Sequence, residues 1–546
     1  MYKNYVLQME DTPTRGDGSE VEIGDRLVCD EYRATLKYIG LVPPTKGVWY
    51  GVEWDDIERG KHDGTHEGHT YFKTKHPKSG SFIRPKKANF GISFMSAVND
   101  RYGRTEDENA GVITEDLYVV DAYNKTTVVE MVGARKVNEL QSKLNELKEV
   151  VVRGLMVYGT LSPTDQSHDL ASLVPSIENL DISLNLIKSW KQIAEITEQL
   201  KNLRVLNVSE NILDVPEKST DLQSSLSHID VLLLNRSSYN WSEILHCCDM
   251  FTNLEQIHLC FNNINVISDI NGRFQHLNLL NLESNNLSDW SYVLHFGHLP
   301  LLETLIVSNN QFTKIEFPSN GSTSTDLFQK LKSLTINYNK IADWQSINEL
   351  NKLQALEVLR TKSNPLMDLA TPETVRQLLI AKIKHLKVCN RTPVNPEERK
   401  GSEIDYLKRF GSEWLKCGGS QDSNKNKPSN EFVSNHPRYN DLIQIWGPPE
   451  DSEMLQKMTS LKSSLINVKI FVPSMPDKKT LEKKVPGSMT VQKLKALIYR
   501  LYKLDTEIQL SYISQKMLGQ EIELDNDQRF LSYYSIEPGD VIQVKL

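Results

Sequence analysis

The chain has 546 residues and a formal net charge of −8 at pH 7, with 39% hydrophobic and 25% charged residues. This composition is ordinary for a folded protein, and the length predicts about three domains. No apolar run of about 18 residues occurs and the N-terminus lacks an apolar signal core, so neither a transmembrane helix nor a secretory signal is expected. Six scattered cysteines favour a reducing compartment.

The first predicted domain, residues 20–90, combines many glycines with aromatic residues. Its centre is the run Gly60-Lys61-His62-Asp63-Gly64. Glycines at this density suit tight turns and the close approach of another backbone. Segment 61–90 holds seven Lys or Arg and only two acidic residues, a net charge of +5 inside an acidic chain. A basic, aromatic-lined groove suits an acidic peptide that ends in a carboxylate, whereas composition alone also allows a solvated basic face.

The Gly60–Gly64 run and the aromatic residues around it resemble the CAP-Gly family. Its members are small β-barrel modules that bind the acidic, aromatic-ended tails of α-tubulin and of some microtubule end-binding proteins. The resemblance implies a peptide site made of the following residues: Trp49, Trp54, Gly60, Lys61, His62, Asp63, Gly64, Phe72, Phe82 and Arg84. His62 departs from the family pattern, which usually has Asn there. Val42-Pro43-Pro44 stands where many members carry an aromatic residue. We expect these departures to weaken or shift peptide affinity.

Residues 91–135 are predicted to connect this domain to a leucine-rich-repeat solenoid at 136–415. The template Leu-x-x-Leu-x-Leu-x-x-Asn-x-Leu recurs in copies that begin at positions 177, 203, 229, 254, 277, 302, 331 and 356. Their spacings of 23 to 29 residues match the leucine-rich-repeat period. Each short strand should turn its apolar side chains inward while the Asn bonds the turn backbone. Because no repeat buries its apolar face alone, stacking builds the core.

A Ser-Trp or Asp-Trp pair follows three of the copies, at Ser189-Trp190, Asp289-Trp290 and Asp343-Trp344. Ser and Asp suit helix caps, and we expect each Trp to pack a convex helix against the sheet as core, not as a ligand site. Residues 374–390 and 403–410 are predicted to cap the carboxyl-terminal end of the solenoid. The concave strand face is expected to bind a partner.

Residues 416–464, polar and rich in Gly, Ser and Asn, are predicted to be a flexible linker. Residues 465–546 then alternate as strands around a helix at 490–501, for which Thr490 is the expected cap. This order resembles a ubiquitin-like β-grasp domain. The chain ends without Gly-Gly, so the resemblance implies a docking module, not one that is conjugated to other proteins. The alternative is a small α+β domain with no partner of its own.

Motifs of common enzyme classes are missing. The sequence holds no phosphate loop, no His-Glu-x-x-His and no Gly-x-Ser-x-Gly, so neither catalysis nor a cofactor is expected. The His and Cys residues between 246 and 260 match no usual zinc spacing, and no metal site is expected. A basic segment at 73–87 could contact phosphates, but the tandem of modules argues against nucleic acid as the partner.

The fold class expected is therefore multidomain, α/β and β: a CAP-Gly β-barrel, a leucine-rich-repeat solenoid and a ubiquitin-like domain. This order resembles the tubulin-folding cofactor family. The resemblance implies a non-enzymatic protein of the cytoplasm and cytoskeleton that binds α-tubulin and assembles or dissociates the αβ-tubulin heterodimer with other folding cofactors. The ubiquitin-like domain would recruit a sister cofactor or the proteasome. The alternatives are a microtubule-associated adaptor and a proteasome-linked adaptor. No binding to a membrane is expected.

Overall fold

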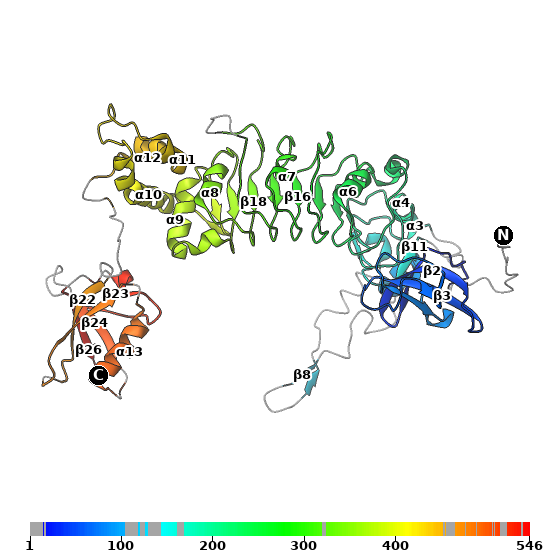
Figure 1. Cartoon of the computed structure of the whole chain (residues 1–546), viewed down its shortest axis with the longest axis horizontal. Coiled ribbons are helices and arrows are strands. Elements are labelled where there is room, and N and C mark those ends of the chain that lie inside the picture. Colours follow the sequence, from blue (N-terminus) through cyan, green and yellow to red (C-terminus); the bar gives the residue numbers. More distant parts are fainter. Residues whose placement is uncertain are drawn as a thin grey trace. The chain divides into compact units, whose positions relative to one another are not determined.

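The computed structural model describes residues 15, 18–103, 118–120, 126–128, 143–160, 169–318, 324–450, 454, 465–475, 477–487, 489–504, 506, 508–513, 521–534, 536 and 539–545. The chain divides into two compact units, Met1–Leu407 with Cys417–Pro448, and Lys408–Lys416 with Pro449–Leu546. The first unit holds a small antiparallel β domain and a repeat solenoid, and the second holds a ubiquitin-like fold (Figure 1). The multidomain fold class expected from the sequence is confirmed.

The amino-terminal β domain is a four-stranded antiparallel sheet in the order β1-β2-β3-β6. Its strands are β1 (Arg26–Cys29), β2 (Tyr32–Leu41), β3 (Val48–Trp54) and β6 (Gly80–Ile83), and a hairpin of β4 (Thr65–His66) and β5 (His69–Thr70) precedes β6. One face of the sheet buries a small core that includes Leu27, Leu36 and Val52, each 0% exposed. The opposite face of the sheet lies outside this core, so its side chains can contact a ligand.

The segment after the β domain is part of the solenoid. β7 (Ile92–Ser93) pairs in parallel with β11 (Val157–Gly159), and α1 (Phe94–Tyr102) contributes Phe94 and Val98 to the solenoid core. The Ser93 side chain caps α1 by accepting from the amide of Ser96. The prediction that 91–135 only connects two domains is therefore wrong for residues 92–102, because the apolar face of α1 covers the first repeats. A hairpin of β8 (Tyr118–Val120) and β9 (Thr126–Val128) also falls in this range.

The solenoid is one eleven-stranded sheet, parallel from its first strand to β20 (Figure 1). Its strands in order are β10 (Glu149–Val151), β12 (Asn179–Asp181), β13 (Val205–Asn207), β14 (Val231–Leu233), β15 (Gln256–His258), β16 (Leu279–Asn281), β17 (Thr304–Ile306), β18 (Ser333–Thr335), β19 (Val358–Arg360), β20 (Val388–Cys389) and the antiparallel β21 (Thr392–Pro393). From β10 to β18, each strand centre and the apolar residue just after the strand turn inward, so the repeats stack in register.

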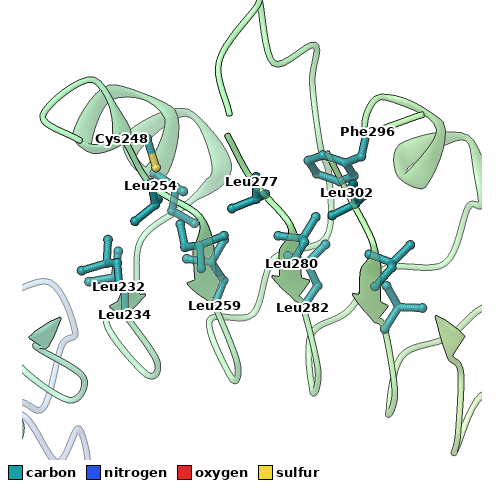
Figure 2. Packing of buried hydrophobic residues seen from close by; sticks show 14 of the residues in the cluster. Leu232, Leu234, Cys248, Leu254, Leu259, Leu277, Leu280, Leu282, Phe296 and Leu302 are labelled. Atoms are coloured by element: carbon teal, nitrogen blue, oxygen red, sulfur yellow. The ribbon is translucent and has the colours of Figure 1, made fainter. Parts of the chain in front are cut away.

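Leucines from successive repeats meet in this core, as Figure 2 shows for Leu254, Leu280 and Leu302. The turn asparagines bond the backbone, as predicted. Asn285 donates to the carbonyl oxygens of Leu259 (2.9 Å) and Leu282 (3.0 Å), and its own amide oxygen accepts from the amides of Asn262 and Ile264 (3.1 Å each). Each buried side chain thus ties one repeat to the previous one.

A left-handed residue opens the turn after each strand. The residues with positive φ at this repeat position are Leu184, Glu210, Arg236, Phe261, Ser284, Asn309, Tyr338 and Ser363. This conformation is uncommon outside glycine. Its recurrence points these side chains away from the core, and Phe261 and Tyr338 are 44% and 62% exposed.

Short helices cover the solenoid on the side away from the sheet. They are α3 (Leu170–Leu173), α4 (Trp190–Thr197), α5 (Gln223–Leu226), α6 (Trp241–Cys248), α7 (Ser291–Leu294) and α8 (Trp344–Leu350), with 3-10 turns at Leu144–Glu146, Ser219–Leu222 and Pro365–Asp368. Ser189 and Asp343 cap α4 and α8 as predicted. Trp190 and Trp290 are 1% and 4% exposed, which confirms that they are core residues.

The carboxyl-terminal cap of the solenoid is larger than expected. α9 (Pro372–Lys382) packs into the core as predicted and α10 (Pro396–Lys416) follows it, but α11 (Asn430–Asn435) and α12 (Tyr439–Trp446) lie within the range predicted as linker. Phe432 and Tyr439 are 1% and 0% exposed. Residues 430–446 are therefore part of the first unit and not a flexible linker, because their aromatic side chains are buried in it.

The ubiquitin-like domain is a five-stranded mixed sheet in the order β23-β22-β26-β24-β25. The strands are β22 (Leu465–Phe471), β23 (Leu481–Pro486), β24 (Gln509–Ile513), β25 (Glu521–Glu523) and β26 (Val541–Lys545), with helix α13 (Val491–Tyr502) and a 3-10 turn at Leu531–Tyr534. Thr490 caps α13, and Val491, Leu494 and Ile498 are buried against the sheet. These elements match those expected from the sequence.

All six cysteines are free thiols, and five are buried. Within the described part of the chain, no helix has the length and apolar character needed to cross a membrane. The same residues contain no group of three His, Cys, Asp or Glu side chains placed to hold a metal ion.

Candidate peptide-binding face

Strand alternation decides which side chains of the β domain face a ligand. Along β3, Tyr50, Val52 and Trp54 face the core, so Trp49 and Gly51 face the opposite side. Trp54, only 5% exposed, is a core residue and does not belong to the predicted site. The same alternation turns Phe82 of β6 toward the side of Trp49, since Phe82 pairs with Gly51.

Glycine is required where the site is most crowded. A side chain on Gly51 would lie 2.4 Å from the ring of Phe72, so its absence lets that ring lie on the sheet. A Cβ on Gly60 would lie 2.1 Å from the carbonyl oxygen of Lys78. Gly64 combines φ of +99° with a similar clash, 2.1 Å from the carbonyl oxygen of Phe72. Gly60 and Gly64 thus shape the loop and offer no side chain to a ligand.

Backbone hydrogen bonds hold the Gly60–Gly64 loop beside β6. The amide of Lys61 donates to the carbonyl of Gly80 (2.7 Å), and the amide of Gly80 donates to the carbonyl of His62 (2.8 Å). Inside the loop, Nδ1 of His62 accepts from the amide of Gly64 (3.0 Å), and Asp63 accepts from the amide of Thr65 (3.0 Å). With its backbone fixed, the loop presents the exposed side chain of Lys61 to solvent.

Phe82 is the centre of a cluster of rings, which we call the aromatic face. Its ring centroid lies within 6.3 Å of those of the following residues: Tyr38 (6.3 Å), His62 (5.1 Å), His66 (6.1 Å), Tyr71 (5.4 Å) and Phe72 (5.5 Å). Phe72 is buried beneath it, and the other rings are half-buried. Four of these five pairs pack edge to face, which holds the rings rigidly and leaves apolar surface for an incoming side chain.

Tyr38, His66 and Tyr71 were missed by reasoning from the motif alone. Tyr38 reaches the face because β2 and β3 pair with Tyr38 opposite Gly51. His66 reaches it on the β4–β5 hairpin. Tyr71 stands next to Phe72 in the chain, and alternation along that extended segment is the one signal that could have suggested it.

Trp49 and Arg84 form a second part of the same side of the sheet. The Arg84 guanidinium carbon lies 3.7 Å from the centroid of the Trp49 ring, and Nη1 of Arg84 donates to the carbonyl of Lys46 (2.9 Å). The indole of Trp49 donates to the Thr45 hydroxyl (2.6 Å). The stacked pair keeps an exposed cation in a fixed position.

Charge around the face is largely uncompensated. Of the seven basic residues in segment 61–90, Lys87 is the one with an ion pair to a described carboxylate, that of Asp30 at 3.6 Å. Burial, reinforced by nearby His66, lowers the pKa of His62, so His62 is neutral at pH 7. Hydrogen bonds from Thr65 lower the pKa of Asp63. The unpaired cations suit an anionic ligand.

The chain is similar to known proteins well beyond the β domain. The CAP-Gly domain family matches residues 23–88, and the ubiquitin-like domain family matches residues 465–545. The chain is 46% identical over 523 residues to tubulin-specific chaperone E of Xenopus laevis, covering 95% of this chain and 98% of that protein. It is 42% identical over 531 residues to the Homo sapiens protein of the same name, covering 96% and 98%.

Among solved structures, the C-terminal ubiquitin-like domain of mouse tubulin-specific chaperone E is 45% identical. It covers 16% of this chain and 92% of that one, with a TM-score of 0.15. The relatives, in contrast, align along nearly the whole length of the chain. The chain therefore belongs to the tubulin-specific chaperone E family.

Proposed function

We propose that the chain is a non-enzymatic tubulin-folding cofactor. It binds α-tubulin, promotes assembly of the αβ-heterodimer together with sister cofactors, and can also separate existing heterodimers. The observation that carries this proposal is the relationship to tubulin-specific chaperone E over 95% of the chain. We place its action in the cytoplasm and at the cytoskeleton, where tubulin is found.

The aromatic face is proposed to hold the acidic tail of α-tubulin. The exposed cations of Lys61 and Arg84 attract the carboxylates of the tail, while Phe82 and its neighbouring rings receive an aromatic end. Contacts of this kind give specificity and fast association more than high affinity. The tail grip alone is therefore expected to be weak.

The repeat sheet is proposed to hold the folded body of α-tubulin. Half-buried aliphatic side chains line the face of the sheet opposite the core, at Val231, Leu233, Leu279 and Ile306. Two linked weak sites raise the effective concentration for each other, so the pair can exceed either affinity by about 10²–10⁴.

The ubiquitin-like domain is proposed to recruit a sister cofactor or the proteasome. The outer face of its sheet carries ion pairs, including Lys545 with Glu521 at 2.6 Å, so a partner there would have to be polar. Phe530, just before the 3-10 turn, and Tyr533, within it, are 52% and 63% exposed and are the better anchors. Large exposed aromatic side chains often carry most of the binding energy in protein interfaces.

The test is to mix the purified chain with αβ-tubulin and separate the products by size-exclusion chromatography. The proposal expects a complex with α-tubulin and loss of β-tubulin from it. If tubulin elutes unchanged while the chain co-sediments with microtubules, the chain is a microtubule adaptor and the proposal is wrong.

A further inference from the structure

Charged side chains pair between neighbouring repeats along the strand starts of the solenoid. Each of these residues stands directly before its strand. The pairs are Lys148 with Glu178 (2.8 Å), Arg204 with Asp230 (3.7 Å), Lys332 with Glu303 (2.8 Å) and Lys387 with Glu357 (2.6 Å). A fifth pair, Arg153 with Glu210 (2.7 Å), links the turns after β10 and β13. Five cations of the solenoid sheet are thus matched by a carboxylate one or two repeats away.

Three cations of the last two repeats have no such pair. Arg360 lies at the end of β19, Lys362 lies in the turn after it, and Arg391 lies at the tip of the β20–β21 hairpin. Across the described residues, none of these three side chains forms an ion pair or a hydrogen bond with a carboxylate. Arg360 is half-buried on the sheet, and its Nε atom is buried without a partner. Lys362 and Arg391 are exposed.

Backbone contacts gather these three cations around an exposed tyrosine. The amide of Tyr338 donates to the carbonyl of Lys362 (2.9 Å), and the amide of Thr361 donates to the side chain of Asn390 (2.9 Å). Asn390 and Arg391 form the hairpin turn with φ of 51° and 76°. Tyr338 is 62% exposed. We call Tyr338, Arg360, Lys362 and Arg391 the terminal cation cluster.

We propose that the terminal cation cluster docks an acidic polypeptide segment of a partner protein. Guanidinium groups bind carboxylates with two parallel hydrogen bonds, and an exposed tyrosine adds a hydrogen-bond donor and an apolar ring. Three like charges held together without compensation repel one another, so an anionic partner relieves a cost that the free protein bears. The cluster lies on the solenoid, far along the sheet from the β domain, and does not depend on the tail grip.

A polypeptide fits the cluster better than a nucleic acid. The cluster is short: the turn positions equivalent to Lys362 in the three preceding repeats hold Asn337, Ser308 and Glu283, none of them basic. Double-stranded nucleic acid carries a charge about every 1.7 Å and needs a longer basic track. A short run of Asp or Glu residues matches the extent of the cluster.

The experiment measures binding of a fluorescein-labelled oligo-glutamate peptide to the full chain by fluorescence polarisation. The peptide is amidated at its C-terminus, so that it lacks the terminal carboxylate that suits the aromatic face. The triple variant Arg360→Gln, Lys362→Gln, Arg391→Gln should bind about tenfold more weakly. The matched control Lys148→Gln, Lys332→Gln, Lys387→Gln removes the same charge from paired positions and should lose less than about twofold.

Three results would overturn the proposal. One is an equal loss in both triple variants, which would mean that net charge alone drives binding. Another is a first triple variant that binds the peptide as the parent chain does. The third is tighter binding of oligo-dT than of the peptide, lost in the first triple variant, which would reassign the cluster to nucleic acid. Matching thermal unfolding curves of both variants verify that each is folded.

Discussion

In the β domain, six of the seven basic residues in segment 61–90 form no ion pair with a described carboxylate, whereas basic residues at the strand starts of the solenoid pair with the neighbouring repeat. Exposed pairs contribute little to stability, typically about 0.2–1 kcal/mol. The clearer effect of these ion pairs is to neutralise surface charge that could otherwise attract an unwanted partner. We therefore propose that, in this chain, a cluster of uncompensated cations marks a binding surface, whereas the paired cations belong to the scaffold.

The largest effect should come from the scaffold itself. Asn285→Ala leaves the buried amides of Asn262 and Ile264 without their acceptor, so we expect the free energy of unfolding to fall by about 2–4 kcal/mol. Urea unfolding followed by circular dichroism measures it. The matched control is Asn286→Ala, at an exposed position, which should change stability by less than about 0.5 kcal/mol. Equal losses would mean that the asparagine ladder does not hold the repeats together.

A second effect concerns acid stability of the carboxyl-terminal cap. Burial, with a smaller contribution from nearby Lys382, lowers the pKa of His436 to about 3, and its ring bonds the Tyr406 hydroxyl at 2.7 Å. Because the unfolded chain takes up this proton near pH ~6.5, the stabilisation is complete above that pH and is lost as pH falls toward 3, by about 1.4 kcal/mol per unit.

The variant His436→Gln removes this titration and keeps a hydrogen-bond acceptor. Unfolding free energies of the parent chain and of this variant, measured between about pH 7 and pH 4, should therefore converge as pH falls. Parallel pH profiles for the two proteins would show that the imidazole is not held neutral in the folded cap.

The third prediction compares an unpaired cation, Lys61, with a paired one, Lys87. Lys61→Ala should weaken binding of a peptide with the sequence of the α-tubulin tail by about tenfold, because an exposed, unpaired cation of the aromatic face is lost. Lys87→Ala removes the same charge from a residue that already pairs with Asp30, and should cost less than about twofold. Isothermal titration calorimetry measures both affinities. Identical losses would contradict the distinction between paired and unpaired cations.

The smallest effect is expected at His62. Asn in its place can still accept from the amide of Gly64, so His62→Asn should change tail affinity by no more than about threefold at neutral pH, or about 0.6 kcal/mol. Burial lowers the pKa of His62, and an acidic ligand would favour its charged form. The parent chain should therefore gain affinity relative to the variant as pH falls below ~6.5. Unchanged relative affinity over that range would exclude protonation of His62 in the complex.

Much of the fold follows from local signals in the sequence. The repeat spacing predicted the solenoid of stacked strands, and Thr490 and the apolar face of α13 predicted the helix of the ubiquitin-like domain. In contrast, α1 and α11–α12 were assigned to connecting segments. These helices have only six to nine residues, too few for a clear repeat of the apolar pattern, and the burial of Phe94 and Tyr439 depends on surfaces supplied by distant residues.

The residues of the site divide in the same way, into those that local sequence identifies and those that depend on the fold. The run Gly60–Gly64 could be recognised from the sequence because its glycines stand where a side chain would clash with nearby backbone. Lys61 lies in the same loop, which exposes its side chain. Trp54 was placed in the site through the family resemblance, but it stands five positions after Trp49 along β3, and this odd offset turns it to the core. Tyr38 could not be found from the motif, since strand pairing with Gly51 brings it to the aromatic face.

The central claim is that uncompensated charge on the aromatic face grips the acidic tail of α-tubulin. The most direct measurement compares the affinity of the chain for intact tubulin with its affinity for tubulin whose tails have been removed by protease. We predict that removing the tails weakens binding by at least about tenfold in the parent chain and has little effect on the Lys61→Ala variant, because that variant has already lost the contact. Equal affinity of the parent chain for both forms of tubulin would contradict the account.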